Sequence, residues 1–438
     1  MLPARSRAAG PDGHPLRGKK VYIAPMADGS ARVFAACLRA HGIDGEAIPP
    51  SDGRTLELGA RFTSGDECYP AKITVGDAIK MLQTPGVDPA RVVFFMPTAT
   101  GPCRFGQYAP FLRQVLDDSG YQTAGVISPS SEDGYAGVGE VASRLFRTAW
   151  RGLVAADVVR KLQLMYRPYE LEPGRTDAVT EASLQDVCRT IEDGRRGNGD
   201  GVAAGPQLEA LRGAIRRARD RFRAIPARRD PGRPLIGVVG EIFCRLNDFS
   251  NDHVVRRLEA QGAEVWLSDV AEWIWYTNSD SFRKLRLHGQ WWTLKHLGAR
   301  IRHLVQRRDE HRLMEVVRED FRGSEEPEIE AMLAGGRPYL PQSGAFGEMV
   351  VSMGKIVHLA RKGVDGIVDI SPFSCMNGIV CEAIYPRLSR DLGGLPIRSF
   401  YFDGTESDLD RDLGVFLELA RAYQARKRHP RVYPPYPA

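Results

Sequence analysis

The chain has 438 residues, of which 43% are hydrophobic and 26% are charged. This length fits two or three domains with substantial cores, and the composition argues against general disorder. The formal net charge of +5 is small for the length and does not indicate a nucleic-acid-binding protein. No run of about 18 apolar residues occurs, so we expect no membrane span. The basic first residues lack the apolar core of a secretory signal, and we therefore expect a cytoplasmic protein.

The first part of the chain alternates short apolar runs with helical patterns. We expect a disordered tail over 1–17 and strands over 20–24, 92–96 and 122–127. One predicted helix ends near His41, and two others cover about 105–119 and 139–165. Alternating strands and helices are typical of an α/β domain with a largely parallel sheet. We expect this domain to span 18–165.

The same pattern returns after a break that is rich in Pro and Gly. Residues 166–231 predict a helical connector, and a second α/β domain is expected over 232–426, followed by a Pro-rich tail over 427–438. Its predicted strands cover 235–240, 264–267, 366–370 and 396–402. Its predicted helices cover 251–261, 345–362 and 407–426, and another begins at about 378. A helical insertion is expected over 281–335. We therefore expect two Rossmann-like or flavodoxin-like parallel-sheet domains with a helical connector and a helical insertion.

The cysteines are odd in number and widely spaced. In a reducing cytosol such residues are core residues, reactive thiols or metal ligands rather than disulfides. Cys103 and Cys375 each stand in a Pro-containing loop between a buried strand and a helix. Ligands of open parallel sheets bind beyond the carboxyl ends of strands, which is where these loops lie. Cys68 precedes Pro70, which is tolerated in the first turn of a helix.

All three of these thiols precede or open a predicted helix. The free N–H groups and partial positive charge at a helix N-terminus favour thiolate. Position alone therefore predicts a three-thiolate site from Cys68, Cys103 and Cys375. No CxxC pair occurs, so the spacing leaves the metal open.

The remaining cysteines have other expected roles. Cys37 and Cys188 lie within helical patterns and are expected to pack in a core. Cys244 follows the buried strand LIGVVG, and Cys381 lies inside a predicted helix six residues after Cys375. These two are candidate further ligands, with packing as the alternative.

Polar residues also follow the strand over 235–240. Glu241, Arg245, Asn247 and Asp248 are candidates for lining a pocket or contacting a substrate. The alternative is that Asn247 and its neighbours up to residue 252 form only a turn and a helix cap. No P-loop, nucleophile elbow, dinucleotide GxGxxG or HExxH occurs. We therefore do not expect the chain to bind ATP by itself.

Four short segments together resemble the cluster-bearing region of acyl-CoA dehydratase activase-related proteins, which are relatives of 2-hydroxyacyl-CoA dehydratase subunits and of double-cubane cluster proteins. They are ECYPAK (67–72), GPCRFGQY (101–108), VGEIFCRLNDFSND (239–252) and SPFSCMNGIVCEAI (371–384), and the resemblance spans about 18–425. It implies a [4Fe–4S] cluster with one open iron, because Cys68, Cys103 and Cys375 match the motif positions of its three ligands. A double-cubane [8Fe–9S] cluster is the alternative.

The resemblance also implies a role in anaerobic metabolism. It implies reductive or radical chemistry on an acyl-CoA or another small molecule, with low-potential electrons from a separate actin-fold ATPase activase. It leaves open whether the chain is a 2-hydroxyacyl-CoA dehydratase-like lyase, an ATP-coupled reductase component or a non-catalytic iron–sulfur electron relay. A metal-free small-molecule-binding α/β protein is a further alternative. We expect a homo- or heterodimer, and neither nucleic acid nor a membrane as a partner.

Overall fold

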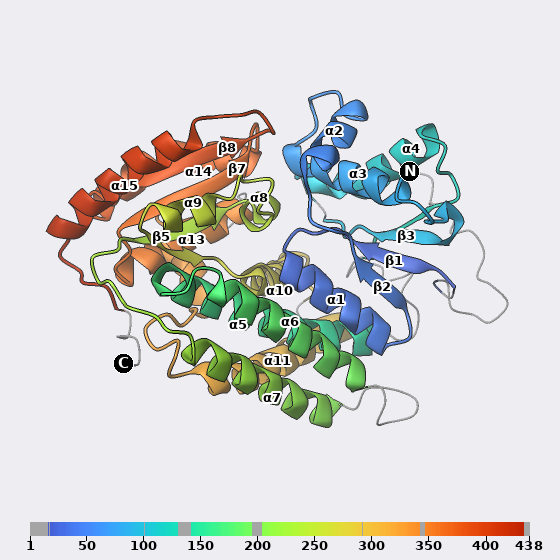
Figure 1. The fold of residues 1–438 in the computed structure, drawn as a ribbon, viewed down its shortest axis with the longest axis horizontal. Coiled ribbons are helices and arrows are strands. Elements are labelled where there is room, and N and C mark those ends of the chain that lie inside the picture. Colours follow the sequence, from blue (N-terminus) through green and yellow to red (C-terminus); the bar gives the residue numbers. More distant parts are fainter. Residues whose placement is uncertain are drawn as a thin grey trace. The chain divides into compact units, whose positions relative to one another are not determined.

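The computed structural model describes residues 16–432 except 17, 100, 130–141, 195–203, 291 and 342–346. The expected N-terminal tail therefore lies outside the described residues except for Leu16, and so does half of the Pro-rich tail. Contacts divide the chain into two compact units (Figure 1). Unit 1 comprises Met1–Glu67, Ala71–Gly152 and Cys188–Gln207, and unit 2 comprises Cys68–Pro70, Leu153–Val187 and Leu208–Ala438.

Unit 1 is built on a four-stranded sheet in which every neighbouring pair is parallel. Its strands are β1 (Lys20–Ile23), β2 (Asp44–Ala47), β3 (Val92–Phe95) and β4 (Gly125–Ile127), in the order β2-β1-β3-β4. Its helices include α1 (Asp28–Ala40), α2 (Gly53–Arg61), nearly all of α3 (Tyr69–Leu82) and α4 (Tyr108–Asp118), which follows a short 3-10 helix η2 (Arg104–Gln107). The three strands that the sequence predicts here are confirmed, whereas β2 and α2 were not predicted.

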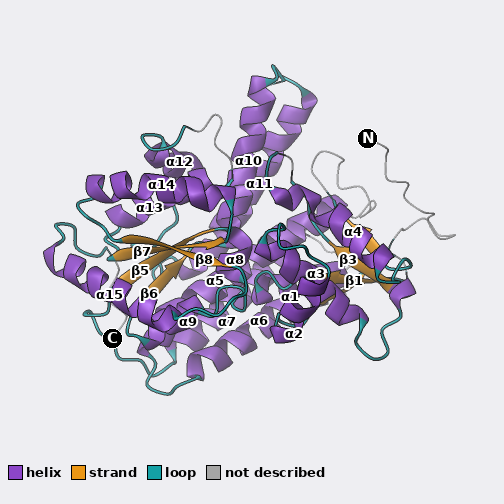
Figure 2. Ribbon diagram, turned by 90° about the horizontal axis from the view of Figure 1, so that it is seen from above, coloured by secondary structure: helices purple, strands orange, loops and turns teal. Residues whose placement is uncertain are grey.

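Unit 2 repeats the same strand order in a second parallel sheet. Its strands are β5 (Leu235–Gly240), β6 (Glu264–Leu267), β7 (Gly366–Pro372) and β8 (Ile397–Phe402), in the order β6-β5-β7-β8. Figure 2 shows helices on both faces of this sheet. One face carries α13 (Glu348–Arg361) and α14 (Met376–Asp391), and the other carries α9 (Val254–Ala260) and α15 (Leu409–Arg426). The expected α/β class with two parallel sheets is confirmed.

Helices α6 (Arg175–Asp193) and α7 (Ala204–Arg223) occupy the segment expected as connector, and α11 (Leu294–Met314) and α12 (Ile329–Gly336) occupy the segment expected as insertion. Helix α5 (Ala142–Tyr166) lies in the expected first domain, whereas α8 (Ile242–Leu246) and most of α10 (Val270–Leu287) lie in the expected second domain outside the insertion. Contacts divide α5, α6 and α7 between the two units, and α10 begins before the expected insertion. None of the helices in the described residues is both long and apolar enough to cross a membrane.

Helices α2 and α3 of unit 1 touch through their backbones at two glycines. A Cβ atom on Gly76 would lie 1.9 Å from the carbonyl oxygen of Thr55, and one on Gly59 would lie 2.1 Å from that of Lys72. Next to Gly76, the buried carboxylate of Asp77 accepts hydrogen bonds from the hydroxyls of Ser51 (2.8 Å) and Thr55 (2.7 Å). This close crossing holds α3, whose first residue follows Cys68.

The substitution Gly76→Ala is expected to destabilise unit 1, because the added methyl group forces two backbones apart. Overpacking of this kind costs about 1–3 kcal/mol. The matched control is Gly53→Ala at the start of α2, where a Cβ meets nothing within 4 Å. Urea unfolding followed by far-UV circular dichroism measures both free energies of unfolding. Equal midpoints for the two variants would contradict the proposed backbone contact.

Candidate metal centre

The loops that follow β5 and β7 lie at the switch point of the unit 2 sheet. These two strands are neighbours, and the chain runs from β5 outward to β6 and from β7 outward to β8. In open parallel sheets, ligands bind at this point beyond the carboxyl ends of the strands. Cys244 lies on α8 directly after β5, and Cys375 is the N-cap residue of α14 directly after β7.

The thiol of Cys375 lies at the N-terminus of a 16-residue helix. Burial and the nearby carboxylates of Glu241 and Glu348 raise its pKa to about 12, against the lowering effect of the N–H groups of Asn377 and Gly378. The side chain makes no capping hydrogen bond, so the N–H groups act through their partial charges. A metal cation would add the positive charge that this environment lacks, and coordinated thiols are deprotonated.

Cys68, Cys244 and Cys381 lie in the same unit as Cys375, and the first two act on one another's surroundings electrostatically. Residues Cys68–Pro70 group with unit 2 by their contacts, and the Cys68 residue is 8% exposed. Cys244 is fully buried. Burial is the main cause that raises the pKa of Cys244, and the charges of Glu241, Cys68 and Cys375 raise it further. The structure therefore brings Cys68, Cys244 and Cys375 within electrostatic range.

Cys103, the remaining predicted ligand, belongs to unit 1. It is the N-cap residue of η2, with φ −66° and ψ 130°, close to the φ −69° and ψ 121° of Cys375. Its side chain is exposed. The guanidinium of the following residue, Arg104, donates to the carbonyl oxygen of Asp66 at 2.7 Å, two residues before Cys68. The set of Cys68, Cys103 and Cys375 stays a prediction.

The other thiols have packing environments. Cys381 belongs to the core that α13 and α14 form, and its sulfur lies 3.8 Å from the carbonyl oxygen of Met349. These contacts favour the packing alternative for Cys381. Cys37 is fully buried within α1, and Cys188 is half-buried on α6, as their helical patterns indicate.

Two carboxyl groups lie beside the cysteine-bearing loops. Glu241 caps α8 by accepting the N–H groups of Phe243 (3.1 Å) and Cys244 (2.8 Å). Glu348, the first residue of α13, accepts the side-chain amide of Asn377 at 2.9 Å. Burial and the charge of Glu241 raise the pKa of Glu348 to about 7, and burial likewise raises the pKa of Glu241. This pair can therefore hold a proton near neutral pH.

Glu348 and Asn377 were not identified from the sequence. Asn377 stands two residues after Cys375, and this neighbourhood could have marked it. Glu348 has no such signal, because its contact with Asn377 joins two helices. Glu241 lies where the sequence placed it, at the end of β5.

Arg245 links these carboxyl groups to a buried network of charges. Its side chain is 3% exposed and lies 3.9 Å from Glu272, and its guanidinium also donates to the carbonyl oxygen of Gly240 at 3.3 Å. Glu272 in turn pairs with Lys355 at 2.9 Å, and Lys355 also pairs with Glu326. The positive charge of Arg245 lowers the pKa of Glu241 and of Glu348, against the effect of burial.

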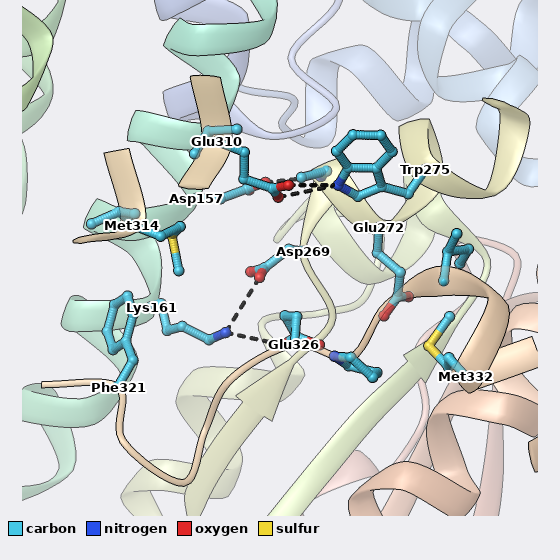
Figure 3. Close-up of a pocket in the computed structure, with 15 residues that line it drawn as sticks. Asp157, Lys161, Asp269, Glu272, Trp275, Glu310, Met314, Phe321, Glu326 and Met332 are labelled. Atoms are coloured by element: carbon cyan, nitrogen blue, oxygen red, sulfur yellow. Dashed lines mark hydrogen bonds and ion pairs between the residues drawn. The ribbon is translucent and has the colours of Figure 1, made fainter. Parts of the chain in front are cut away.

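The same network borders a small cavity in unit 2, shown in Figure 3. The cavity measures about 60 Å³, which is enough for a few water molecules. Lys161 pairs there with Glu326 (2.9 Å) and Asp269 (3.4 Å), and the indole N–H of Trp275 donates to Glu310 at 3.0 Å. Burial raises the pKa of Glu310 to about 7. None of these residues was predicted from the sequence as part of a site.

Asn247 and Asp248 behave as the turn alternative predicts. The side-chain oxygen of buried Asn247 accepts the N–H of Ser250 (2.9 Å) and its hydroxyl (2.7 Å). The carbonyl oxygen of exposed Asp248 accepts the N–H of His253 at 2.8 Å. Helix α9 begins only at residue 254, after His253 in a left-handed conformation with φ 56°. These bonds give the Asn247 side chain and the Asp248 backbone a role in the turn.

The substitution Glu348→Gln is expected to change how stability depends on pH. A carboxyl whose pKa is raised from 4.5 to about 7 on folding destabilises the folded state as pH rises through that window. At 1.36 kcal/mol per pKa unit, the loss amounts to about 3 kcal/mol by neutral pH. From pH 4.5 to pH 7, the unfolding free energy of wild type should therefore fall relative to that of the variant. Urea unfolding of metal-free protein measures it.

The exposed carboxylate of Glu418, which is on α15 and pairs with Arg421, provides the control for this change. Glu418→Gln removes one carboxylate without a buried environment, so its difference from wild type should change little over the same window. If the difference in unfolding free energy from wild type depends as little on pH for Glu348→Gln as for Glu418→Gln, the buried carboxyl pair is contradicted.

The donor set of the candidate centre consists of thiols, which are the ligands that iron–sulfur clusters take. No group of three or more His, Cys, Asp or Glu side chains in the described part of the chain is arranged to hold a metal ion. Sulfur ligands of one ion lie about 4 Å apart at a metal–sulfur distance of about 2.3 Å. Cluster ligands bind different irons and lie farther apart. Cys68 and Cys375 both influence Cys244 electrostatically, and Cys375 lies at the N-terminus of α14.

Comparisons with known proteins add no relative. A scan against protein-family models finds no family that matches the chain, and a search of the curated proteins finds no match either.

Proposed function

We propose that the chain is an iron–sulfur protein that receives low-potential electrons from a separate ATP-dependent activase and uses them on an acyl-CoA or another small molecule. One observation carries the proposal. Cys375 stands at the switch point of a parallel sheet, in the same unit as Cys68 and Cys244 and with the N–H groups of Asn377 and Gly378 nearby. The resemblance of the cysteine-bearing segments to dehydratase-related proteins supplies the class of reaction.

Cys68, Cys103 and Cys375 would hold a [4Fe–4S] cluster, with Cys244 as the candidate additional or replacement thiolate. Three protein thiolates leave one iron open, and such an iron supplies Lewis-acid or inner-sphere electron chemistry.

The other residues of the centre control protons and charge. The carboxyl pair of Glu241 and Glu348 holds a proton near neutral pH, and Asn377 fixes one oxygen of Glu348. Arg245 provides a fixed positive charge beside this pair. Its guanidinium is buried, so water does not screen that charge. Reductive chemistry on a bound substrate consumes protons as well as electrons, and this pair, whose charges act on Cys375, would be a source of protons for it.

Anaerobic purification from iron-replete cells tests the proposal. We expect a coloured protein with broad visible absorption and about four iron and four sulfide ions per chain. About eight irons per chain would indicate the double-cubane alternative. A colourless, iron-free protein under these conditions would contradict both clusters and favour the metal-free small-molecule-binding protein.

A non-catalytic electron relay is distinguished by its electron balance. After reduction of the cluster, a relay returns its electrons only to another protein. In an enzyme, an added acyl-CoA would accept electrons from the cluster or be converted to product. The absorbance of the reduced protein with and without 2-hydroxyacyl-CoA or aromatic acyl-CoA compounds separates the two cases.

A further inference from the structure

Helices α10 and α11 of unit 2 expose apolar side chains. The two helices lie side by side and extend away from the β5–β8 sheet (Figure 2). Large apolar side chains are exposed where α10 ends and along α11, and Leu294 reaches 87%. They are Leu287, Trp292, Leu294, Leu297, Ile301 and Leu304. Contiguous exposed apolar surface of this kind marks an interaction site.

Four of these side chains form a single row on α11, which we call the α11 seam (Leu294, Leu297, Ile301 and Leu304). Their spacing of three, four and three residues places them on one side of the helix. The opposite side of α11 packs on α10. There, the rings of His296 and His303 contact Phe282 at 5.6 and 5.5 Å, and Gln306 accepts the amide of Asn278 at 3.0 Å. The seam is therefore unpartnered in the described part of the chain.

The seam has the form of a helix-pairing surface. A narrow apolar row with this spacing is typical of helices that pack against another helix, whereas helices that lie on membranes carry a wide apolar face. On α11, the exposed polar residues Arg300 and Arg302 directly flank Ile301 and keep the row narrow. A protein helix therefore fits this surface better than a lipid surface.

The charge of the hairpin indicates the chemistry of its partner. Residues 281–308 carry eight basic residues and no Asp or Glu: Arg283, Lys284, Arg286, Lys295, Arg300, Arg302, Arg307 and Arg308. Arg286, Arg300, Arg302 and Arg308 are exposed and have no acidic partner among the described residues. Two copies packed through this seam would bring like charges together, which disfavours pairing. Acidic residues at the flanks of the partner helix would instead be attracted.

We propose that the α11 seam binds a helix of another protein, with an apolar row at heptad spacing and acidic residues on both sides of it. The apolar rows interlock, and the acidic flanks pair with Arg300 and Arg302, which lie on either side of the row. This interaction does not depend on the proposed cluster.

A designed peptide of 28 residues, with Leu at the a and d positions and Glu at e and g, is the probe. Its charge keeps it monomeric, and fluorescence anisotropy with the full chain measures binding. We expect micromolar binding that weakens at least tenfold in Leu297→Ser/Ile301→Ser. The matched control is Val415→Ser/Leu419→Ser on α15, where two exposed apolar residues have the same spacing. This control should bind like wild type.

Other occupants give different results. Equal binding of a peptide with Lys at e and g, equal binding by the seam variant, or no binding at all would overturn the proposal. Sedimentation velocity that shows a dimer lost only in the seam variant would assign the seam to a second copy instead. Flotation with phosphatidylglycerol vesicles that depends on the seam, in the absence of peptide binding, would assign it to an anionic membrane surface. Either result would overturn the protein-helix proposal.

Discussion

Replacement of Cys375 by serine is expected to remove most of the iron from the anaerobically purified chain. Serine retains the shape of the side chain but not the soft thiolate that iron–sulfur clusters require. Cys375 combines a strand-end position with nearby N–H groups, so we expect its loss to affect the cluster most directly. Cys103→Ser is expected to have the same effect. Iron and sulfide determinations per chain measure it, with far-UV circular dichroism to show that the variants fold.

Cys188→Ser is the matched control, because Cys188 is a half-buried thiol on α6 that the proposal does not use. This variant should keep the iron content of wild type. Equal iron retention in Cys103→Ser, Cys188→Ser and Cys375→Ser would count decisively against the ligand set. If Cys244→Ser loses iron and Cys103→Ser retains it, the third ligand is Cys244 rather than Cys103.

The sequence predicted the central strands of the unit 2 sheet well because β5 and β7 are fully buried and continuous. The six residues of β5 are all buried and read as one apolar run, LIGVVG. The edge strand β2, with the sequence DGEA, carries no β-branched or aromatic residue and is partly exposed, so no apolar run marks it. Helix α2 depends on its cap, in which Asp52 accepts the N–H of Thr55 at 2.9 Å, and on backbone contact with α3.

The candidate site was predictable only where it follows a strand. Cys375 and Glu241 each come directly after a strand, and the rule that ligands bind at strand ends identifies both. Glu348 joins the site through the amide of Asn377, which lies 29 residues later in the chain. A contact between two helices leaves no local pattern. For the same reason, the paired charges of Arg245 and Glu272 could not be predicted, because each alone resembles an ordinary surface charge.

Lys355→Met is expected to destabilise unit 2 by about 3–5 kcal/mol, the usual cost of leaving buried charges without their partner. Lys355 is fully buried and pairs with both Glu272 and Glu326. Neither carboxylate oxygen of Glu272 has a well-aligned hydrogen bond among the described residues, so its charge depends on its ion pairs with Lys355 and Arg245. Methionine preserves most of the side-chain volume, and the loss therefore reports on charge. Urea unfolding at neutral pH measures it.

Lys362→Met provides the comparison within the same structure. Lys362 is the C-cap residue of α13 and pairs at 3.1 Å with Glu325, the residue next to Glu326, but Glu325 is 56% exposed. Exposed pairs contribute about 0–1 kcal/mol, so this variant should stay near wild type. Similar losses for the two variants would show that Lys355 acts through packing. A larger loss for Lys355→Met would mean that the charges that hold Arg245 beside Glu241 and Glu348 also stabilise unit 2.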